Sequence, residues 1–170
     1  MNTFVLEKLE EFVTDKVTYY SVRFVDKEIT EFEAFVLKHA QQANIQDEWA
    51  DLMLWMEERL GRRSGALKHL FRHEGKADGL PPSAQYLDID YEQNIRLYCL
   101  RICDHVVVLF NGGIKTEQKA QDCPTVKPHF TNAQYLAESI TKAMSGRDRE
   151  INLSLDEFEL EFDDETEFGS

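Results

Sequence analysis

The chain has 170 residues, of which 42% are apolar, and its formal net charge is −13 at pH 7. Such a chain is long enough for one domain with a real core, and no stretch approaches the roughly 18 consecutive apolar residues of a membrane span. The first residues show no basic region followed by an apolar run, as a secretory signal would, and three cysteines without a CxxC pair indicate neither a disulfide framework nor a structural zinc site. We therefore expect a soluble cytoplasmic protein with free thiols and no membrane partner.

The charge is unevenly distributed. Residues 1–58 hold 5 basic and 13 acidic side chains, residues 59–146 hold 12 and 9, and residues 147–170 hold 2 and 10. The densest basic stretch, GRRSGALKHLFRHEGK (residues 61–76), is called the basic island below, and it contains a single acid, Glu74. Because attraction to a polyanion depends on the local field, an acidic chain can still present a positive face.

The first sixty residues predict three helices and one strand. Apolar residues at helical spacing predict a helix over 3–14, and the β-branched and aromatic run VTYYSVRFV predicts a strand over 17–25. A second helix is predicted over 27–42. Asp47 can cap a third, which ends at Leu60 because glycines follow.

The pattern weakens over residues 66–93. Two glycines and two prolines predict a loop at its centre, while ALKHLF and QYLDID are short runs that each fit a strand.

The next segment predicts a hairpin of strands over 94–102 and 105–114. Its second strand contains VVVLF, which is apolar at every position, as expected of a central strand covered on both faces. A helix capped by Asn132 should follow.

The acidic C-terminus alternates strictly between apolar and polar residues over 151–155 and 158–162, which predicts two short strands. We therefore expect one domain over residues 1–146 and an acidic extension over residues 147–170.

Few residues suggest catalysis or metal binding. His69 and His73 are four apart, as two metal ligands on one helix face would be, but nothing nearby completes the set. No GxSxG motif is present, and Cys99 lies within a predicted strand, where it should pack as a small apolar residue. We predict neither a metal site nor a cofactor.

Basic and aromatic side chains on the hairpin are the better candidates. Alternation places Arg96 and Tyr98 on one face of their strand and Arg101 on the other, and Lys115 follows the neighbouring strand. Together with the basic island, such residues can hold an RNA backbone and stabilise the charge of in-line cleavage by the 2′-hydroxyl, while imidazole or tyrosine moves protons.

A simpler alternative stays open for the two hairpin arginines. Arg96 and Arg101 can be surface strand residues that pair with Glu92 and Asp104.

The run IRLYCLRICDHVVVLFNGGIKT, preceded by a strand and two helices, resembles the RelE/ParE/HigB superfamily of bacterial toxins, especially its phage-derived HigB-like branch. VTYYSVRFV resembles the first strand of that family, and ALKHLFRHEGK falls where the family carries its basic segment. The positions that carry the resemblance within the run are Arg96, Tyr98, VVVLF (106–110), Gly113 and Lys115.

The resemblance implies an α+β fold: a RelE-like antiparallel sheet flanked by helices, here with an extra N-terminal helix and acidic C-terminal strands. It implies the toxin of a type II toxin–antitoxin system, an endoribonuclease that cleaves ribosome-bound mRNA without a metal and is silenced by an antitoxin with a helix-turn-helix domain. The catalytic residues it implies are Arg96, Lys115 and His69 or His73. The RNA-binding residues would be Arg62, Arg63, Lys68, Arg72, Lys76, Arg101 and Tyr98.

Two further hypotheses compete with this interpretation. The same fold can act as a non-catalytic interaction module whose basic island binds an acidic or DNA-binding protein. The acidic extension can also fold back over the basic face and mimic RNA, since opposite charges attract at close range.

Overall fold

The computed structural model describes residues 3–83, 93–116, 123–147 and 167–168. This part of the chain forms a mixed α+β fold with one sheet in the order β3-β4-β5-β6-β2-β1-β7. Its strands are β1 (Phe4–Val13), β2 (Thr18–Phe24), β3 (Arg72–Glu74), β4 (Ala77–Leu80), β5 (Ile95–Cys103), β6 (Val106–Ile114) and β7 (Glu167–Phe168). The predicted antiparallel sheet is wrong at one place, because β2 pairs with β6 in parallel.

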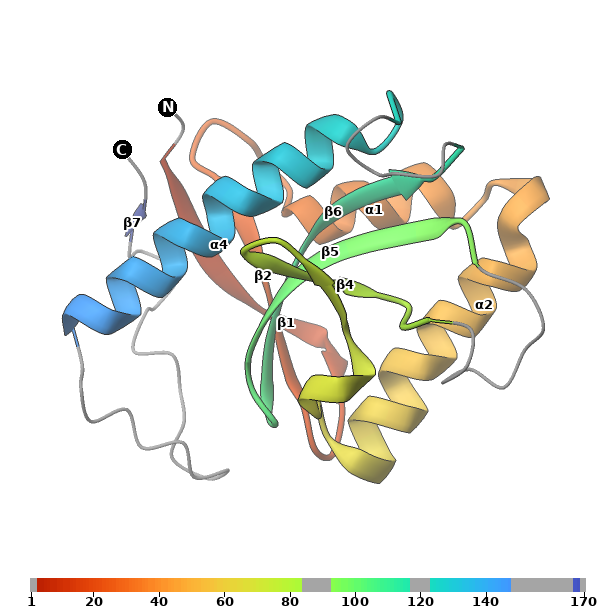
Figure 1. Cartoon of the computed structure of the whole chain (residues 1–170), viewed down its shortest axis with the longest axis horizontal. Coiled ribbons are helices and arrows are strands. Elements are labelled where there is room, and N and C mark those ends of the chain that lie inside the picture. The colour runs from red at the N-terminus through yellow and green to blue at the C-terminus, as the bar shows by residue number, and fades with distance from the viewer. Residues whose placement is uncertain (1–2, 84–92, 117–122, 148–166, 169–170) are drawn as a thin grey trace.

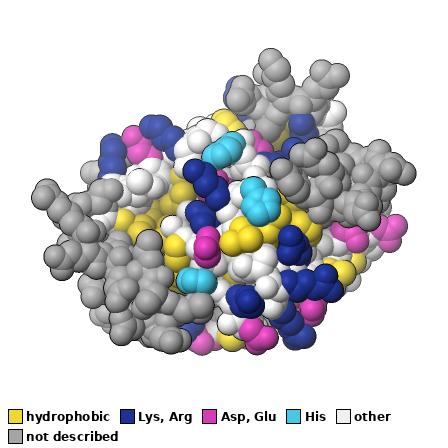
Figure 2. All heavy atoms as spheres, turned by 60° about the horizontal axis from the view of Figure 1, so that its bottom comes forward, with side chains coloured by type: hydrophobic (Ala, Val, Ile, Leu, Met, Phe, Trp, Pro, Cys, Tyr) yellow, Lys and Arg dark blue, Asp and Glu magenta, His cyan; other side chains and the backbone are white. Residues whose placement is uncertain are grey.

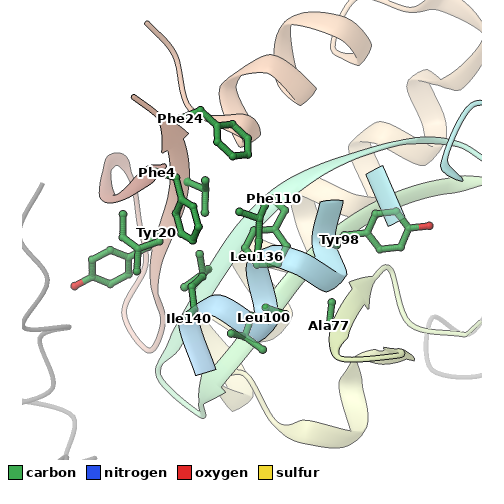
Figure 3. Packing of buried hydrophobic residues seen from close by; sticks show 14 of the residues in the cluster. Phe4, Tyr20, Phe24, Ala77, Tyr98, Leu100, Phe110, Leu136 and Ile140 are labelled. Atoms are coloured by element: carbon green, nitrogen blue, oxygen red, sulfur yellow. The ribbon is translucent and has the colours of Figure 1, made fainter. Parts of the chain in front are cut away.

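Helices cover both faces of the sheet (Figure 1). They are α1 (Glu31–His39), α2 (Gln46–Leu54), the π-helix η2 (Trp55–Ser64) and α4 (Lys127–Arg147), with 3-10 turns η1 (Ala43–Ile45) and η3 (Lys68–Leu70). One apolar cluster lies between the sheet and α4, and a second lies between the sheet, α1, α2 and η2. Figure 3 shows the first cluster, in which Leu136 and Ile140 of α4 pack toward Phe4 and Phe110.

The predicted N-terminal helix is wrong, because these residues form β1. The register with β2 shifts between Lys8 and Val13, so the strand contributes to both clusters. Phe4 and Leu6 lie in the cluster at α4, whereas Leu9 and Phe12 pack against the other. This change of side imitates the spacing of a helix.

The predicted strand over 17–25 and the predicted hairpin are confirmed as β2, β5 and β6. All five residues of VVVLF, Val106–Phe110, are buried, and β6 lies at the centre of the sheet order. The second predicted helix is confirmed as α1. Its first turn is capped by Thr30, whose hydroxyl accepts a hydrogen bond from the Glu33 amide at 3.1 Å.

The third predicted helix starts and ends differently from the expectation. It begins at Gln46, without a side-chain cap, and runs through Gly61 to Ser64 as the π-helix η2. Gly61 does not end this helix. It lets the helix pack closely against the β1–β2 turn, because a Cβ at this position would lie only 2.6 Å from the Thr14 side chain.

The loop predicted at the centre of residues 66–93 is wrong in part. Residues 77–80 form β4, and ALKHLF contributes η3 instead of a strand, with β3 starting just after it. QYLDID lies outside the described residues. A short β3–β4 hairpin buries few residues, so its alternation is too brief to stand out from its glycines.

The last helix begins at Lys127, five residues before the predicted cap Asn132. Pro128 lies in its first turn, where no amide donor is needed. The two predicted acidic strands lie outside the described residues. Farther along, β7 pairs with the start of β1, at the opposite edge of the sheet from β3.

Candidate functional site at the β3 edge of the sheet

Residues from β3, β4 and β5 form a row on the α4 face of the sheet. Arg72 and Glu74 are two apart in β3 and therefore share a face. Arg72 pairs with Gly79 of β4, and Gly79 pairs in turn with Tyr98 of β5. The three strands thus bring Arg72, Glu74 and Tyr98 to one side of the sheet edge.

Two more cations extend this row. Arg96 lies two residues before Tyr98 on the same face and pairs with Gly113 of β6. Lys115 follows two residues after Gly113, and its amide donates to the Asn94 carbonyl at 2.7 Å. We call Arg72, Glu74, Arg96, Tyr98 and Lys115 the charged cluster.

Glu74 is the only carboxylate of the charged cluster, and its surroundings change its acidity. Burial raises its pKa above the usual 4.5, against the opposing charges of Arg96, Arg72 and Lys115, which lower it. The side chain is half-buried and thus keeps access to solvent. A carboxylate with a raised pKa is a stronger base, and that property is typical of catalytic acid–base groups.

Gly79 makes room for this carboxylate. A Cβ at Gly79 would lie 3.0 Å from Glu74 Cγ, so any larger residue would displace the Glu74 side chain. A glycine inside a strand, away from any turn, often marks a site where another group approaches closely.

Arg96 and Tyr98 form the buried wall of the charged cluster. Arg96 is 4% exposed, and its guanidinium donates hydrogen bonds to the carbonyls of Gln93 and Ile95. Tyr98 is fully buried, and its hydroxyl has no hydrogen-bond partner among the described residues. Burial raises its pKa, and the negative charge of the nearby Glu74 raises it further. In Figure 3 the Tyr98 hydroxyl points away from the other labelled side chains.

The start of α4 lies beside this row. A Cβ at Gly113 would lie 2.6 Å from the Thr125 carbonyl, which shows how closely the turn before α4 approaches β6. Cys123 lies in this turn, and its Sγ is within 3.2 Å of the Thr116 amide and hydroxyl and 3.0 Å of the Thr125 hydroxyl. Burial opposes ionisation, but these hydrogen bonds outweigh it and lower the Cys123 pKa to about 6.

The predicted histidines lie apart from Glu74. His73 lies between Arg72 and Glu74 in β3, so its side chain projects to the opposite face of the strand. In the strand register His73 is opposite Asp78 of β4. His69 is exposed in η3. The structure therefore brings together Arg72, Arg96, Tyr98 and Lys115 of the predicted residues, and it leaves both histidines outside this group.

The other predicted RNA-binding residues lie at the surface or on the opposite face. Arg62, Arg63, Lys68 and Lys76 are exposed. Of these, Arg62 forms an ion pair with Glu58 at 3.3 Å, and Lys76 forms one with Glu138 at 2.9 Å. Figure 2 turns the lower side of Figure 1 forward and shows Lys, Arg and His side chains gathered there among acidic and apolar ones.

Arg101 follows the simpler alternative in part. Its guanidinium contacts Asp104 at 2.5 Å and donates to the Ala66 carbonyl, on the face opposite Arg96. The predicted pair of Arg96 with Glu92 involves a residue outside the described part of the chain.

The sequence interpretation missed Glu74 and Gly79. The signal was available, since Glu74 is the sole acid of the basic island and RHEGKADGL is a short hairpin pattern around Gly75-Lys76.

Comparison with family models, curated proteins and solved structures finds no match to this chain. Within the described residues, no group of three or more His, Cys, Asp or Glu side chains is placed to hold a metal ion. In the same residues, no helix is both long enough and apolar enough to cross a bilayer.

Proposed function

We propose that the protein is a metal-independent endoribonuclease and that Glu74 is its general base. The observation that carries this proposal is the charged cluster, in which Arg72, Arg96 and Lys115 surround one half-buried carboxylate. Three cations and one anion leave a net positive site, which suits a phosphodiester. This is the arrangement needed to take a proton and stabilise a developing negative charge.

The proposed reaction uses the 2′-hydroxyl of RNA as the nucleophile. Glu74 takes the proton from that hydroxyl, the 2′ oxygen attacks the adjacent phosphorus, and the bond to the 5′ oxygen breaks. The products are a 2′,3′-cyclic phosphate and a 5′-hydroxyl end, whose proton comes from water. The raised pKa makes Glu74 a stronger base than an ordinary glutamate.

The cations divide into two roles according to burial. Arg72 and Lys115 are half-buried and contact the phosphate oxygens. Arg96 is held by backbone carbonyls behind Glu74 and acts on it electrostatically, as a positioning residue. Exposed residues of the basic island, such as Lys68 and Arg62, attract the flanking backbone.

The substrate class follows the implied family, ribosome-bound mRNA, with an antitoxin as the partner. In the proposed mechanism His69 and His73 do not touch the reacting atoms. They contribute to the outer basic surface, since His73 lies on the other face of β3 from Glu74.

The test is cleavage of ribosome-bound mRNA and of free RNA by the purified full-length chain in the presence of EDTA. Primer extension should reveal new 5′-hydroxyl ends, and the matching fragments should carry cyclic phosphates. A folded preparation that produces no new ends on either substrate contradicts the proposal and favours the non-catalytic interaction module.

A further inference from the structure

The outer surface of α2 and η2 carries a groove whose lining includes no residue of the charged cluster. Its volume is about 310 Å³, within the usual range for ligand sites. The π-helix η2 forms one wall, and π-helical turns occur frequently at functional sites. The groove is lined by Asp51, Leu54, Trp55, Glu58, Arg59, Arg63 and Gln93.

Two of the residues that line the groove, Leu54 and Trp55, are apolar. Leu54 is 59% exposed, an unusual state for a large aliphatic side chain, and Trp55 lies next to it in the chain. Arg59 lies over the Trp55 ring, with its Cζ 5.9 Å from the ring centroid. This surface can therefore cover a large apolar side chain between Leu54 and the arginine.

The two acids and the two arginines of the groove differ in whether they already have a partner within the chain. Both acids are engaged within the chain, because Asp51 accepts a hydrogen bond from Gln93 at 3.2 Å and Glu58 pairs with Arg62. In the described part of the chain, neither Arg59 nor Arg63 forms an ion pair with a carboxylate. The groove thus presents two arginines to a negatively charged group.

Two buried polar atoms in the lining residues also lack partners. Trp55 is 8% exposed and Gln93 is 1% exposed, and in the part of the chain that the structure describes neither the indole Nε1 donor nor the Gln93 Oε1 acceptor has a hydrogen-bond partner. Buried polar atoms normally find partners. Both residues line the groove, so its lining contains two residues whose buried polar atoms are unsatisfied within the described part of the chain.

We propose that this groove binds a peptide segment of a protein partner, in which a large apolar side chain lies next to one or two carboxylates. The apolar side chain packs on Leu54 and Trp55, and the carboxylates pair with Arg59 and Arg63. An RNA strand fits less well, because its unbroken row of phosphates would also pass the Asp51 and Glu58 carboxylates, whereas a peptide needs only one or two charges beside the arginines.

The experiment selects a phage-displayed library of random 12-residue peptides against the immobilised full-length chain. Enriched peptides should contain Asp or Glu next to Leu, Phe or Trp, and fluorescence anisotropy then measures their affinities. Arg63→Ala and Leu54→Asp should each weaken binding about tenfold. Lys38→Ala is the control, because Lys38 is an exposed cation of α1 that lies outside the groove lining, and it should change affinity less than about twofold.

A second measurement reports directly on the groove. The chain has two tryptophans, Trp49 and Trp55, so Trp49→Phe leaves Trp55 as the sole emitter. Addition of an enriched peptide should change Trp55 emission at the concentrations that produce the anisotropy signal.

Several outcomes overturn the proposal. They are the absence of enriched peptides, equal binding by the parent and by Arg63→Ala, and displacement of the peptides by poly-uridine RNA. All of these are independent of RNA cleavage, which depends on Glu74 and not on the groove.

Discussion

Two basic regions of this molecule look alike in composition but differ in what surrounds their charges. The basic island spreads exposed cations over η2, η3 and the β3–β4 turn, and two of them, Arg62 and Lys76, form surface ion pairs. The charged cluster sets three cations around one half-buried carboxylate, and burial raises the pKa of that carboxylate. The difference shows that the number of cations is a poor guide to a reactive site, because exposed charges are screened and half-buried ones act on each other.

The largest expected effect is on catalysis when the base of the charged cluster is removed. Glu74→Gln keeps the shape of the side chain and should lower RNA cleavage by about 10²- to 10⁴-fold, the usual contribution of a general base. RNA affinity should be retained. Glu57→Gln, at an exposed carboxylate of η2, is the control and should cleave normally. Full activity of Glu74→Gln would remove the charged cluster from the mechanism.

The next effect separates the two regions by stability. Arg96→Ala leaves the carbonyls of Gln93 and Ile95 without their buried donor, so the free energy of unfolding should fall by about 1–3 kcal/mol. Lys68→Ala, at an exposed island residue, should change it by less than about 0.5 kcal/mol. Urea unfolding followed by circular dichroism measures both, and equal losses would show that Arg96 has no special role in stability.

A third change tests whether the position of Glu74 matters. Gly79→Ala places a methyl group 3.0 Å from Glu74 Cγ and should lower cleavage about tenfold by displacing the carboxylate. In the Glu74→Gln background the same substitution should have no further effect on cleavage, because the displaced base is already absent. Additive losses in the double variant would place the effect of Gly79 elsewhere.

The pH dependence should follow Glu74. In the proposed mechanism cleavage needs the ionised carboxylate, so the rate should rise with pH through a midpoint above 4.5. Arg96→Ala should move that midpoint higher, because Arg96 lowers the Glu74 pKa. The raised pKa also means that the folded protein binds more protons than the unfolded chain in this window. The free energy of unfolding should therefore fall as pH rises through it, and less so in Glu74→Gln. A pH-independent rate would argue against a titrating base.

The smallest effect concerns the basic island. Lys68→Ala should weaken affinity for single-stranded RNA only about two- to threefold and lower the slope of affinity against salt by about 0.7, with the cleavage rate at saturation unchanged. Fluorescence anisotropy at several salt concentrations measures this. If Lys68→Ala lowered the saturating cleavage rate as much as Glu74→Gln, the basic island and the charged cluster would have to act as one catalytic site.

Local sequence patterns predicted the secondary structure correctly where a long strand has a regular pattern of buried residues. The run VVVLF correctly predicted a central strand. The alternation of IRLYCLRI correctly placed Arg96 and Tyr98 on one face of their strand and Arg101 on the other. They failed at β1, whose register shift imitates helical spacing, and at β4, which is too short for its alternation to be recognised. At β1 the pairing with β2 outweighed the local signal, whereas at β4 the local signal was too short to detect.

The sequence by itself determined that the chain folds as a mixed α+β domain, that its strongest hairpin carries arginines on opposite faces, and that residues 61–76 are basic. Only the tertiary structure decided that Glu74, the one acid of that island, lies among Arg72, Arg96 and Lys115 while His73 lies on the other face. The physical reason is that adjacent residues of a strand project to opposite sides, whereas strands pair across long separations in the chain. A site built across three strands is therefore visible only once their pairing and register are known.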